Sequence, residues 1–188
     1  MGQRGERAQG GSQSLLRIVA FEPYHATAFR DLNLEWIEEY FEVEELDRKH
    51  LGLPRESFID AGGAIFMAEL NGSPVGCCGL LRHDDGVYEI SKMAIRRGDR
   101  GGGIGSMLLD AVIAHARRIG AKRLEIISST RLAPAIHLYK KKGFVEVPLA
   151  SDAYARGNIA LELELTGRAS SDAAGAKVSS QSQVRNGN

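Results

Sequence analysis

A run of glycines is the part of this sequence best suited to binding a charged ligand. It follows Arg100 and leads directly into an apolar stretch with helical periodicity. Glycine lets a backbone approach a ligand closely and adopt positive φ angles, and the start of a helix offers free N–H groups and a positive dipole end. Together they predict a site for a phosphate or pyrophosphate. The loop residues are Arg100, Gly101, Gly102, Gly103, Ile104, Gly105 and Ser106.

Two common phosphate-binding patterns do not fit this loop. A nucleoside-triphosphate loop needs Gly-Lys-Ser/Thr, whereas Met107 follows Ser106 and no lysine is present. A dinucleotide fingerprint needs a third glycine where Ser106 stands, and an acidic residue at the end of the next strand, whereas Glu125 lies early in it. A glycine-rich turn that binds nothing stays open as an alternative, although Arg100 beside the loop favours an anion.

The apolar periodicity predicts the strands and helices that would hold this loop in place. Apolar residues three and four apart indicate helices, and short runs rich in β-branched residues indicate strands. Asn71-Gly72 separates two such runs and predicts a tight hairpin turn. The predicted order, that of a mixed α/β sheet, is strand 15–21, helices 23–40, 44–50 and 55–61, strands 64–70, 74–81 and 87–95, helix 104–119, strand 122–128, helix 134–142, and strands 144–147 and 158–165.

The composition indicates one soluble globular domain. The chain has 188 residues, 43% hydrophobic and 26% charged, and its 24 basic residues balance 24 acidic ones. A neutral chain has no long-range field to attract nucleic acid, and no apolar stretch is long enough to span a membrane. We expect a folded domain over 14–166 between disordered segments 1–13 and 167–188.

Three further features predict a reduced, cytoplasmic protein without a metal. The N-terminus lacks the apolar block of a signal peptide. Cys77 and Cys78 are adjacent in a predicted strand, where neighbours point to opposite faces and pair poorly as a disulfide. The five histidines have no metal-ligand spacing.

At three places the sequence resembles the GCN5-related N-acetyltransferases, the GNAT superfamily. The family's loop, Gln/Arg-x-x-Gly-x-Gly/Ala, corresponds to residues 100–105. Residues 89–95 resemble the strand that leads into that loop. Residues 135–144 resemble the second signature, a helix with Ala-x-x-x-Tyr that ends at Gly-Phe. The resemblance covers about residues 15–165.

A narrower likeness points to a bacterial branch that includes free-standing enzymes and domains fused to MarR-type regulators. It is carried by residues 29–47, by Lys92-Met93-Ala94, by residues 133–136 and by residues 154–158, which read Tyr-Ala-Arg-Gly-Asn.

The resemblance implies a GNAT fold, with a mixed sheet of about seven strands and about four helices, and acetyl-CoA as cosubstrate without a metal. It implies that Glu89 acts as general base, directly or through water, because a partly desolvated carboxylate is more basic. It implies that Tyr139 protonates the leaving thiolate as general acid. The alternatives are an exposed Glu89 at a strand start and a Tyr139 that only packs its helix. The other implied cofactor contacts, besides the loop, are Met93, Ala94, Ile95 and Ser129.

The acceptor pocket is expected between the first long helix and the segment before the last strand. Arginine with Asn and Tyr suits a carboxylate-bearing amine such as an amino acid. Core packing is the alternative for Trp36, and a surface ion pair is the alternative for Arg156. The candidate residues are Arg30, Asn33, Trp36, Tyr40, Tyr154, Arg156 and Asn158.

The expected activity is transfer of the acetyl group of acetyl-CoA to the amine of a small molecule. A peptide or protein N-acetyltransferase is one alternative, and a regulatory module that binds acetyl-CoA without turnover is another. No nucleic acid or membrane partner is expected, and the resemblance is compatible with a homodimer. Leu132, Ser129 and His137 stand where the family or its branch often has Asn, which bears on acceptor specificity more than on CoA binding.

Overall fold

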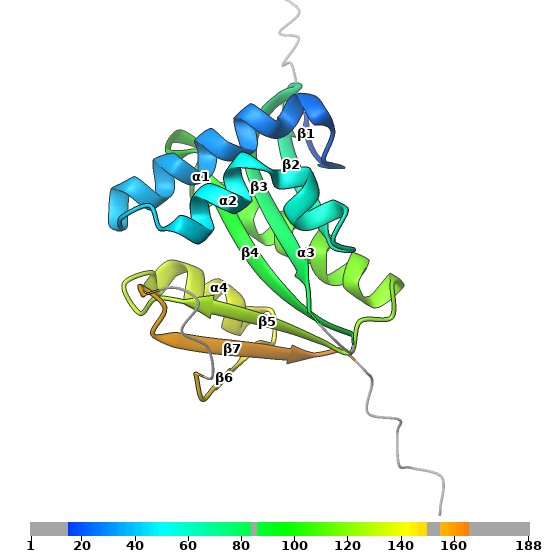
Figure 1. Ribbon diagram of the computed structural model, residues 1–188, viewed down its shortest axis with the longest axis vertical. Helices are drawn as coiled ribbons and strands as arrows, with labels where there is room; N and C mark the ends of the chain where they lie inside the picture. The colour runs from blue at the N-terminus through cyan, green and yellow to red at the C-terminus, as the bar shows by residue number, and fades with distance from the viewer. Residues whose placement is uncertain (1–14, 84–85, 150–154, 166–188) are drawn as a thin grey trace, which may run out of the picture.

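The computed structural model describes residues 15–83, 86–149 and 155–165, which form one seven-stranded mixed sheet with helices on both faces (Figure 1). The two terminal segments predicted to be disordered lie outside the described residues. The strand order is β1-β2-β3-β4-β5-β7-β6, and only β4 and β5 run parallel. The strands are β1 (Leu16–Ala20), β2 (Ala64–Leu70), β3 (Ser73–Arg82), β4 (Val87–Ile95), β5 (Arg123–Ser128), β6 (Val145–Val147) and β7 (Ile159–Glu164).

Four α-helices and three shorter helical turns complete the described part of the chain. The predicted mixed α/β fold is confirmed, and most element ends lie within two residues of those expected. The predicted helix 55–61 is instead a short π-helical turn. The helices are α1 (Ala26–Tyr40), α2 (Glu45–Gly52), α3 (Ile104–Arg118) and α4 (Ala133–Lys141), and the turns are Pro23–His25, Arg55–Ile59 and Arg97–Asp99.

Two apolar cores lie on opposite faces of the sheet. One packs α3 and α4 on one face and includes Leu108, and the other packs α1, α2 and the π turn and includes Phe29 and Phe58. In Figure 1, α1 and α2 lie in front of the sheet and α3 lies behind it. Because side chains alternate along a strand, Cys77 belongs to the α1 side and Cys78 to the α3 side, and both are free thiols.

The sheet opens between β4 and β5, which pair only at their N-terminal ends. Residues 87–89 of β4 face residues 123–125 of β5, and beyond them the two strands separate (Figure 1). A bulge accompanies this separation, because residues 91–94 of β4 oppose the shorter stretch 77–79 of β3. Lys92, within the bulge, has a φ of 51°. A bulge bends a strand and interrupts its hydrogen-bond ladder, so the backbone of β4 can turn toward the opening.

Candidate active site

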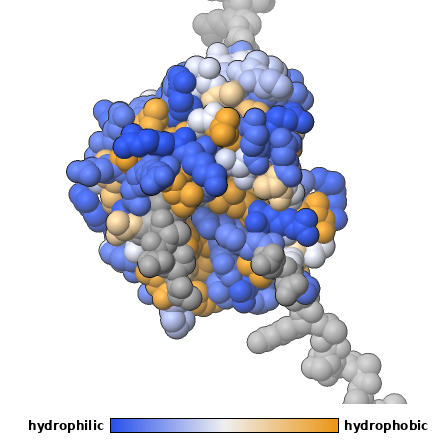
Figure 2. Space-filling view, in the orientation of Figure 1, coloured by the Kyte–Doolittle hydropathy of each residue, from blue (hydrophilic) through white to orange (hydrophobic). Residues whose placement is uncertain are grey.

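A cavity of about 480 Å³ occupies the place where β4 and β5 separate. This volume is typical of small-molecule sites. Its walls come from β4, β5, the second half of α1, the N-terminal end of α3, one side of α4, and the segment before β7. Figure 2 shows apolar side chains near the centre of this face of the molecule, next to hydrophilic ones. Elements from both cores therefore meet around one cavity.

The glycine loop forms one end of this cavity and has the backbone that the sequence predicts. Gly101 and Gly103 both have a φ of 83°, and Gly103 is the N-cap of α3. A Cβ added at either would meet no atom within 4 Å, so glycine is needed there for backbone conformation and not for space. At Gly105 an added Cβ would lie 3.3 Å from the Leu138 and Met93 side chains, so this glycine lets α3 approach them. The backbone N–H groups at the start of α3 have no side-chain cap from the described residues and are therefore accessible to an anion.

Arg100 is held beside the loop by two hydrogen bonds. Its Nε donates to the carbonyl of Ile95 at 3.1 Å, and its Nη1 donates to Oε2 of Glu39 at 2.8 Å. Its Nη2 is buried, and no acceptor among the described residues reaches it. A buried guanidinium N–H needs an acceptor, and a phosphate oxygen is the acceptor that this group binds well. The arginine and the helix start therefore fit the phosphate groups of CoA.

The wall beyond the loop is formed by the bulged end of β4 and by the loop after β5. Met93 and Ile95 line the cavity, whereas the Ala94 side chain packs in the α1-side core. Ser129 lines the opposite wall and is buried, and its hydroxyl accepts a hydrogen bond from the backbone N–H of Arg131 at 3.4 Å. The cofactor candidates are thus gathered around one cavity, except that Ala94 and Gly102 do not line it.

Glu89 lies in the cavity wall and not on the surface. It is 8% exposed, and its Oε2 lies 3.2 Å from Nε2 of His83, the residue directly after β3. The His83 side chain is 48% exposed. Glu89 thus links the cavity to a histidine that reaches solvent. No motif in the sequence pointed to His83, because the antiparallel register of β3 and β4 alone brings the two side chains together.

Tyr139 lies in the same cavity, on α4. Its ring is buried, and its hydroxyl lies 3.9 Å from the sulfur of Met93. Burial, with a smaller contribution from Cys78, raises the pKa of the Tyr139 phenol above its usual range. The hydroxyl therefore keeps its proton at neutral pH and can act as a donor.

The candidates for the acceptor pocket divide into two groups. Asn33, Trp36 and Tyr40 line the cavity. Arg30 does not, because its exposed side chain pairs with Asp31 on the same helix.

Two other acceptor candidates, Tyr154 and Asn158, precede β7 in the sequence. Asn158 is outside the cavity wall. Its amide instead accepts from the backbone N–H of Thr130 at 2.8 Å and donates to the Thr130 hydroxyl at 3.0 Å, so it fastens the loop after β5. Tyr154 lies outside the described residues.

Arg156 lines the cavity, but its guanidinium group already forms ion pairs with carboxylates of the protein. It donates to both oxygens of Asp47, at 2.7 and 2.8 Å, and to Glu44 at 2.9 Å. Lys92 also donates to Asp47, at 2.7 Å. Burial alone would raise the pKa of Asp47, but Arg156 and Lys92 lower it to about 2. Arg156 therefore forms an ion pair, which was the alternative expected for this residue. The pair is partly buried and not on the surface.

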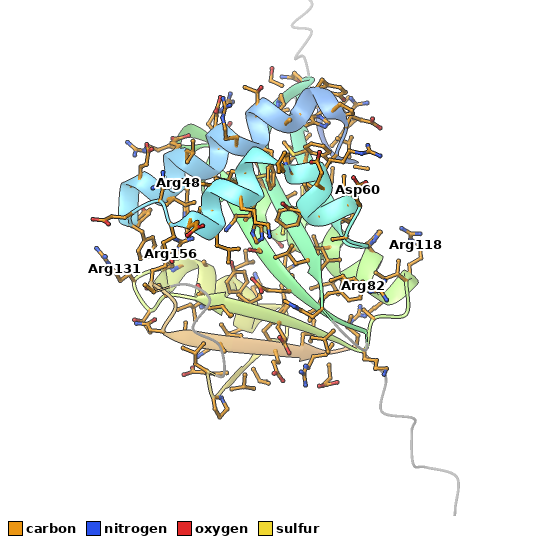
Figure 3. All side chains as sticks on the ribbon, viewed as in Figure 1. Arg48, Asp60, Arg82, Arg118, Arg131 and Arg156 are labelled. Atoms are coloured by element: carbon orange, nitrogen blue, oxygen red, sulfur yellow. The ribbon has the colours of Figure 1, made fainter. Side chains whose placement is uncertain are left out.

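A second guanidinium stands at the same end of the cavity. Arg131 and Arg156 both lie over the ring of Phe41, with 5.4 and 5.8 Å between guanidinium carbon and ring centroid. Figure 3 shows the two arginines on the same side of the molecule, below α1 and α2. Arg131 is exposed and lines the cavity, and no carboxylate of the described residues pairs with it. No motif in the sequence points to Arg131, because only the fold places it beside Phe41.

No group of three or more His, Cys, Asp or Glu side chains in the described part of the chain is arranged to hold a metal ion. None of the described helices is long and apolar enough to cross a bilayer.

Comparison with known proteins identifies the family. Residues 27–144 match the Acetyltransferase (GNAT) family. The IAA acetyltransferase of Azospirillum brasilense is 30% identical over 115 residues, which cover 55% of this chain and 74% of that protein.

Solved structures share the fold. A GNAT-family acetyltransferase from Staphylococcus aureus superposes with a TM-score of 0.73 at 20% identity, over 80% of this chain and 99% of that chain. A protein from Salmonella typhimurium solved with its cofactor acetyl-CoA gives a TM-score of 0.67 at 21% identity, over 85% and 99%. Since the family match spans more than half of the sequence and the splayed sheet and glycine loop agree with it, this chain belongs to the GNAT family of acetyltransferases.

Proposed function

We propose that the chain transfers the acetyl group of acetyl-CoA to the amine of a small molecule, with Glu89 as general base and Tyr139 as general acid. One observation carries this proposal. A buried carboxylate and a buried phenol lie in the wall of a single cavity, and that cavity begins at a glycine loop fit for phosphate. Base, acid and anion site are the groups that acyl transfer to an amine requires.

Acetyl-CoA, when bound, supplies a thioester, whose carbonyl carbon accepts the amine and whose sulfur leaves as a thiolate. The N–H groups at the start of α3 and Nη2 of Arg100 would hold its phosphates. The backbone at the β4 bulge, from Met93 to Ile95, would hold the carbonyl and the arm. These groups fix the position of the thioester between the base and the acid.

Glu89 would take a proton from the acceptor ammonium. The hydrogen bond to His83 then offers this proton a way out, since Glu89 borders the cavity and His83 borders solvent. Tyr139 would protonate the thiolate, because its phenol is held neutral by burial.

The acceptor itself is proposed to be a small amine with an aromatic or apolar body. Trp36, Tyr40 and Phe41 form an aromatic cluster in the cavity wall, with Trp36 6.4 Å from Tyr40 and 5.9 Å from Phe41 between ring centroids. An amino acid would need a cation for its carboxylate. Arg131 is better suited than Arg156 for this contact, because Asp47 and Glu44 already engage Arg156.

Amine-dependent release of free thiol tests the proposal. The protein is mixed with acetyl-CoA and with phenethylamine, phenylalanine, a polyamine or a short peptide, and the acetylated product is identified by mass spectrometry. We expect small primary amines to accelerate thiol release well above the hydrolysis background. Acetyl-CoA binding without amine-stimulated thiol release would favour the regulatory module. Acetylation of the peptide alone would favour the peptide or protein N-acetyltransferase.

A further inference from the structure

Asn33 has one polar atom that the protein leaves without a partner. The residue is 1% exposed and lies in the middle of α1, in the wall of the active-site cavity. Its Nδ2 donates to the carbonyl of Phe29 at 2.8 Å and to the sulfur of Cys77 at 3.2 Å. Its Oδ1 is buried, and no donor among the described residues reaches it.

The orientation of this amide is fixed by chemistry. A backbone carbonyl can only accept, so the amide atom that faces Phe29 must be the nitrogen. The Cys77 thiol in turn donates to the carbonyl of Lys92 in the β4 bulge, at 3.5 Å, which leaves its sulfur to accept from Asn33. Oδ1 therefore cannot exchange places with Nδ2, and it remains a buried acceptor.

Unpartnered buried atoms are concentrated at this cavity. In the described part of the chain, three buried side-chain atoms lack a hydrogen-bond partner, and those of Asn33 and Arg100 belong to cavity-lining residues. The Arg100 atom is a donor beside the phosphate loop, and the Asn33 atom is an acceptor beside the β4 bulge. Native proteins satisfy buried polar atoms almost always, so each of these atoms points to a ligand group of opposite kind.

We propose that Oδ1 of Asn33 accepts a hydrogen bond from the acceptor amine during acetyl transfer, and that this contact makes the site selective for primary amines. The inference rests on the proposed function. Asn33 is a positioning residue in this scheme, since it touches the nitrogen without exchanging a proton with it. An amide N–H of the pantetheine arm could donate to the same Oδ1 instead of the amine. Acetyl-CoA affinity distinguishes these two donors.

The proton balance explains the selectivity. A primary amine arrives as an ammonium with three N–H bonds. One proton goes to Glu89 and leaves through His83, and a second is lost as the C–N bond forms and the C–S bond breaks. The thiolate takes a proton from Tyr139, and the second amine proton replaces it on Tyr139, so that one proton is released overall. The third N–H stays in the product amide and can donate to Asn33 throughout, whereas a secondary amine ends with none.

The first arm of the test measures stability without ligand. Asn33→Leu removes the unpartnered oxygen, while the Phe29 carbonyl retains its helical hydrogen bond. We expect the variant to melt at the same temperature as the parent or about 2 °C higher. A structural role for Asn33 predicts a lower melting temperature and would overturn the proposal. Asn33→Ala, which removes the same oxygen with less bulk, repeats the test in case leucine does not fit.

The second arm compares phenethylamine with N-methylphenethylamine. We expect either variant to lower kcat/KM for phenethylamine about tenfold, and to reduce the preference for the primary amine by a similar factor. The dissociation constant of acetyl-CoA should stay within about twofold of the parent value. Thr27→Ala, an exposed position on α1 outside the cavity, serves as the matched control and should change none of these values.

Three outcomes overturn the inference. Weaker acetyl-CoA binding in the variants assigns Oδ1 to the pantetheine arm. An unchanged preference for the primary amine removes the role in selectivity, while the proposed function survives. If the parent chain acetylates neither amine, the proposed function for such acceptors fails, and the inference fails with it.

Discussion

At the scale of single residues, sequence motifs pointed to the residues proposed as base and acid but not to their partners. Glu89 and Tyr139 could be placed because each occurs at a fixed distance from a recognisable loop or helix end. The cluster of Asp47, Lys92 and Arg156 could not, because its members are distant in sequence and meet only through the fold. For the same reason the sequence alone favours an acceptor carboxylate as the partner of Arg156, whereas the fold pairs it with Asp47 and Glu44.

His50 provides a residue-scale prediction for stability. The residue is buried on α2 against Phe58, and burial, with the charges of Lys92 and Lys49, lowers the pKa of His50 to about 4. An unfolded histidine titrates near 6.5, so between these values the unfolded chain binds more protons than the folded one. Stability is therefore present above about pH 6.5 and is lost as the pH falls toward 4.

We expect this site to contribute about 2 to 3 kcal/mol to the fall in unfolding free energy between pH 7 and pH 4. Urea denaturation of the parent and of His50→Gln at a series of pH values measures the contribution. The variant should lose less stability over this range, since glutamine does not titrate. Asp47, with a pKa of about 2 in the folded protein, adds to the loss near pH 4 because it is protonated in the unfolded chain, but this contribution is common to both proteins and cancels in the comparison. Equal losses in both proteins would contradict the assignment.

At the scale of elements, local periodicity was enough to predict nearly every strand and helix. The hairpin at Asn71 and Gly72 is an example, because both residues have the positive φ that such a turn requires. The sheet order was not predictable in this way, since β7 inserts between β5 and β6 through long-range pairing. The point at which β4 and β5 separate, and hence the cavity, depends on that pairing and on the β4 bulge.

The glycine loop supports an element-scale prediction. Gly103→Ala places a Cβ at a φ of 83°, which should cost about 1 kcal/mol and shift the start of α3. We expect acetyl-CoA to bind about fivefold or more weakly, measured by isothermal titration calorimetry. Gly98→Ala is the matched control, because this nearby glycine has no positive φ and open space around its Cα. Equal affinity in the two variants would show that the loop conformation does not govern binding.

At the scale of the whole molecule, the site lies where the two cores approach each other. The α1 side contributes Asn33 and the aromatic cluster, and the α3 side contributes the glycine loop and Tyr139. β4 belongs to both, since its alternating side chains face one core or the other. The sheet is thus opened at its only parallel pair among the described strands, and both faces supply side chains to one cavity.

The pH dependence of kcat/KM in Glu89→Gln, compared with Glu125→Gln, tests the catalytic account most directly. Glu125 faces Glu89 in the β4–β5 register, but it pairs with Arg123 and does not line the cavity. We expect Glu89→Gln to lower kcat/KM about a hundredfold at neutral pH, with a smaller loss at high pH and unchanged acetyl-CoA affinity. Glu125→Gln should remain within about twofold of the parent. A Glu89→Gln enzyme with the parent rate and pH profile would show that Glu89 is not the base.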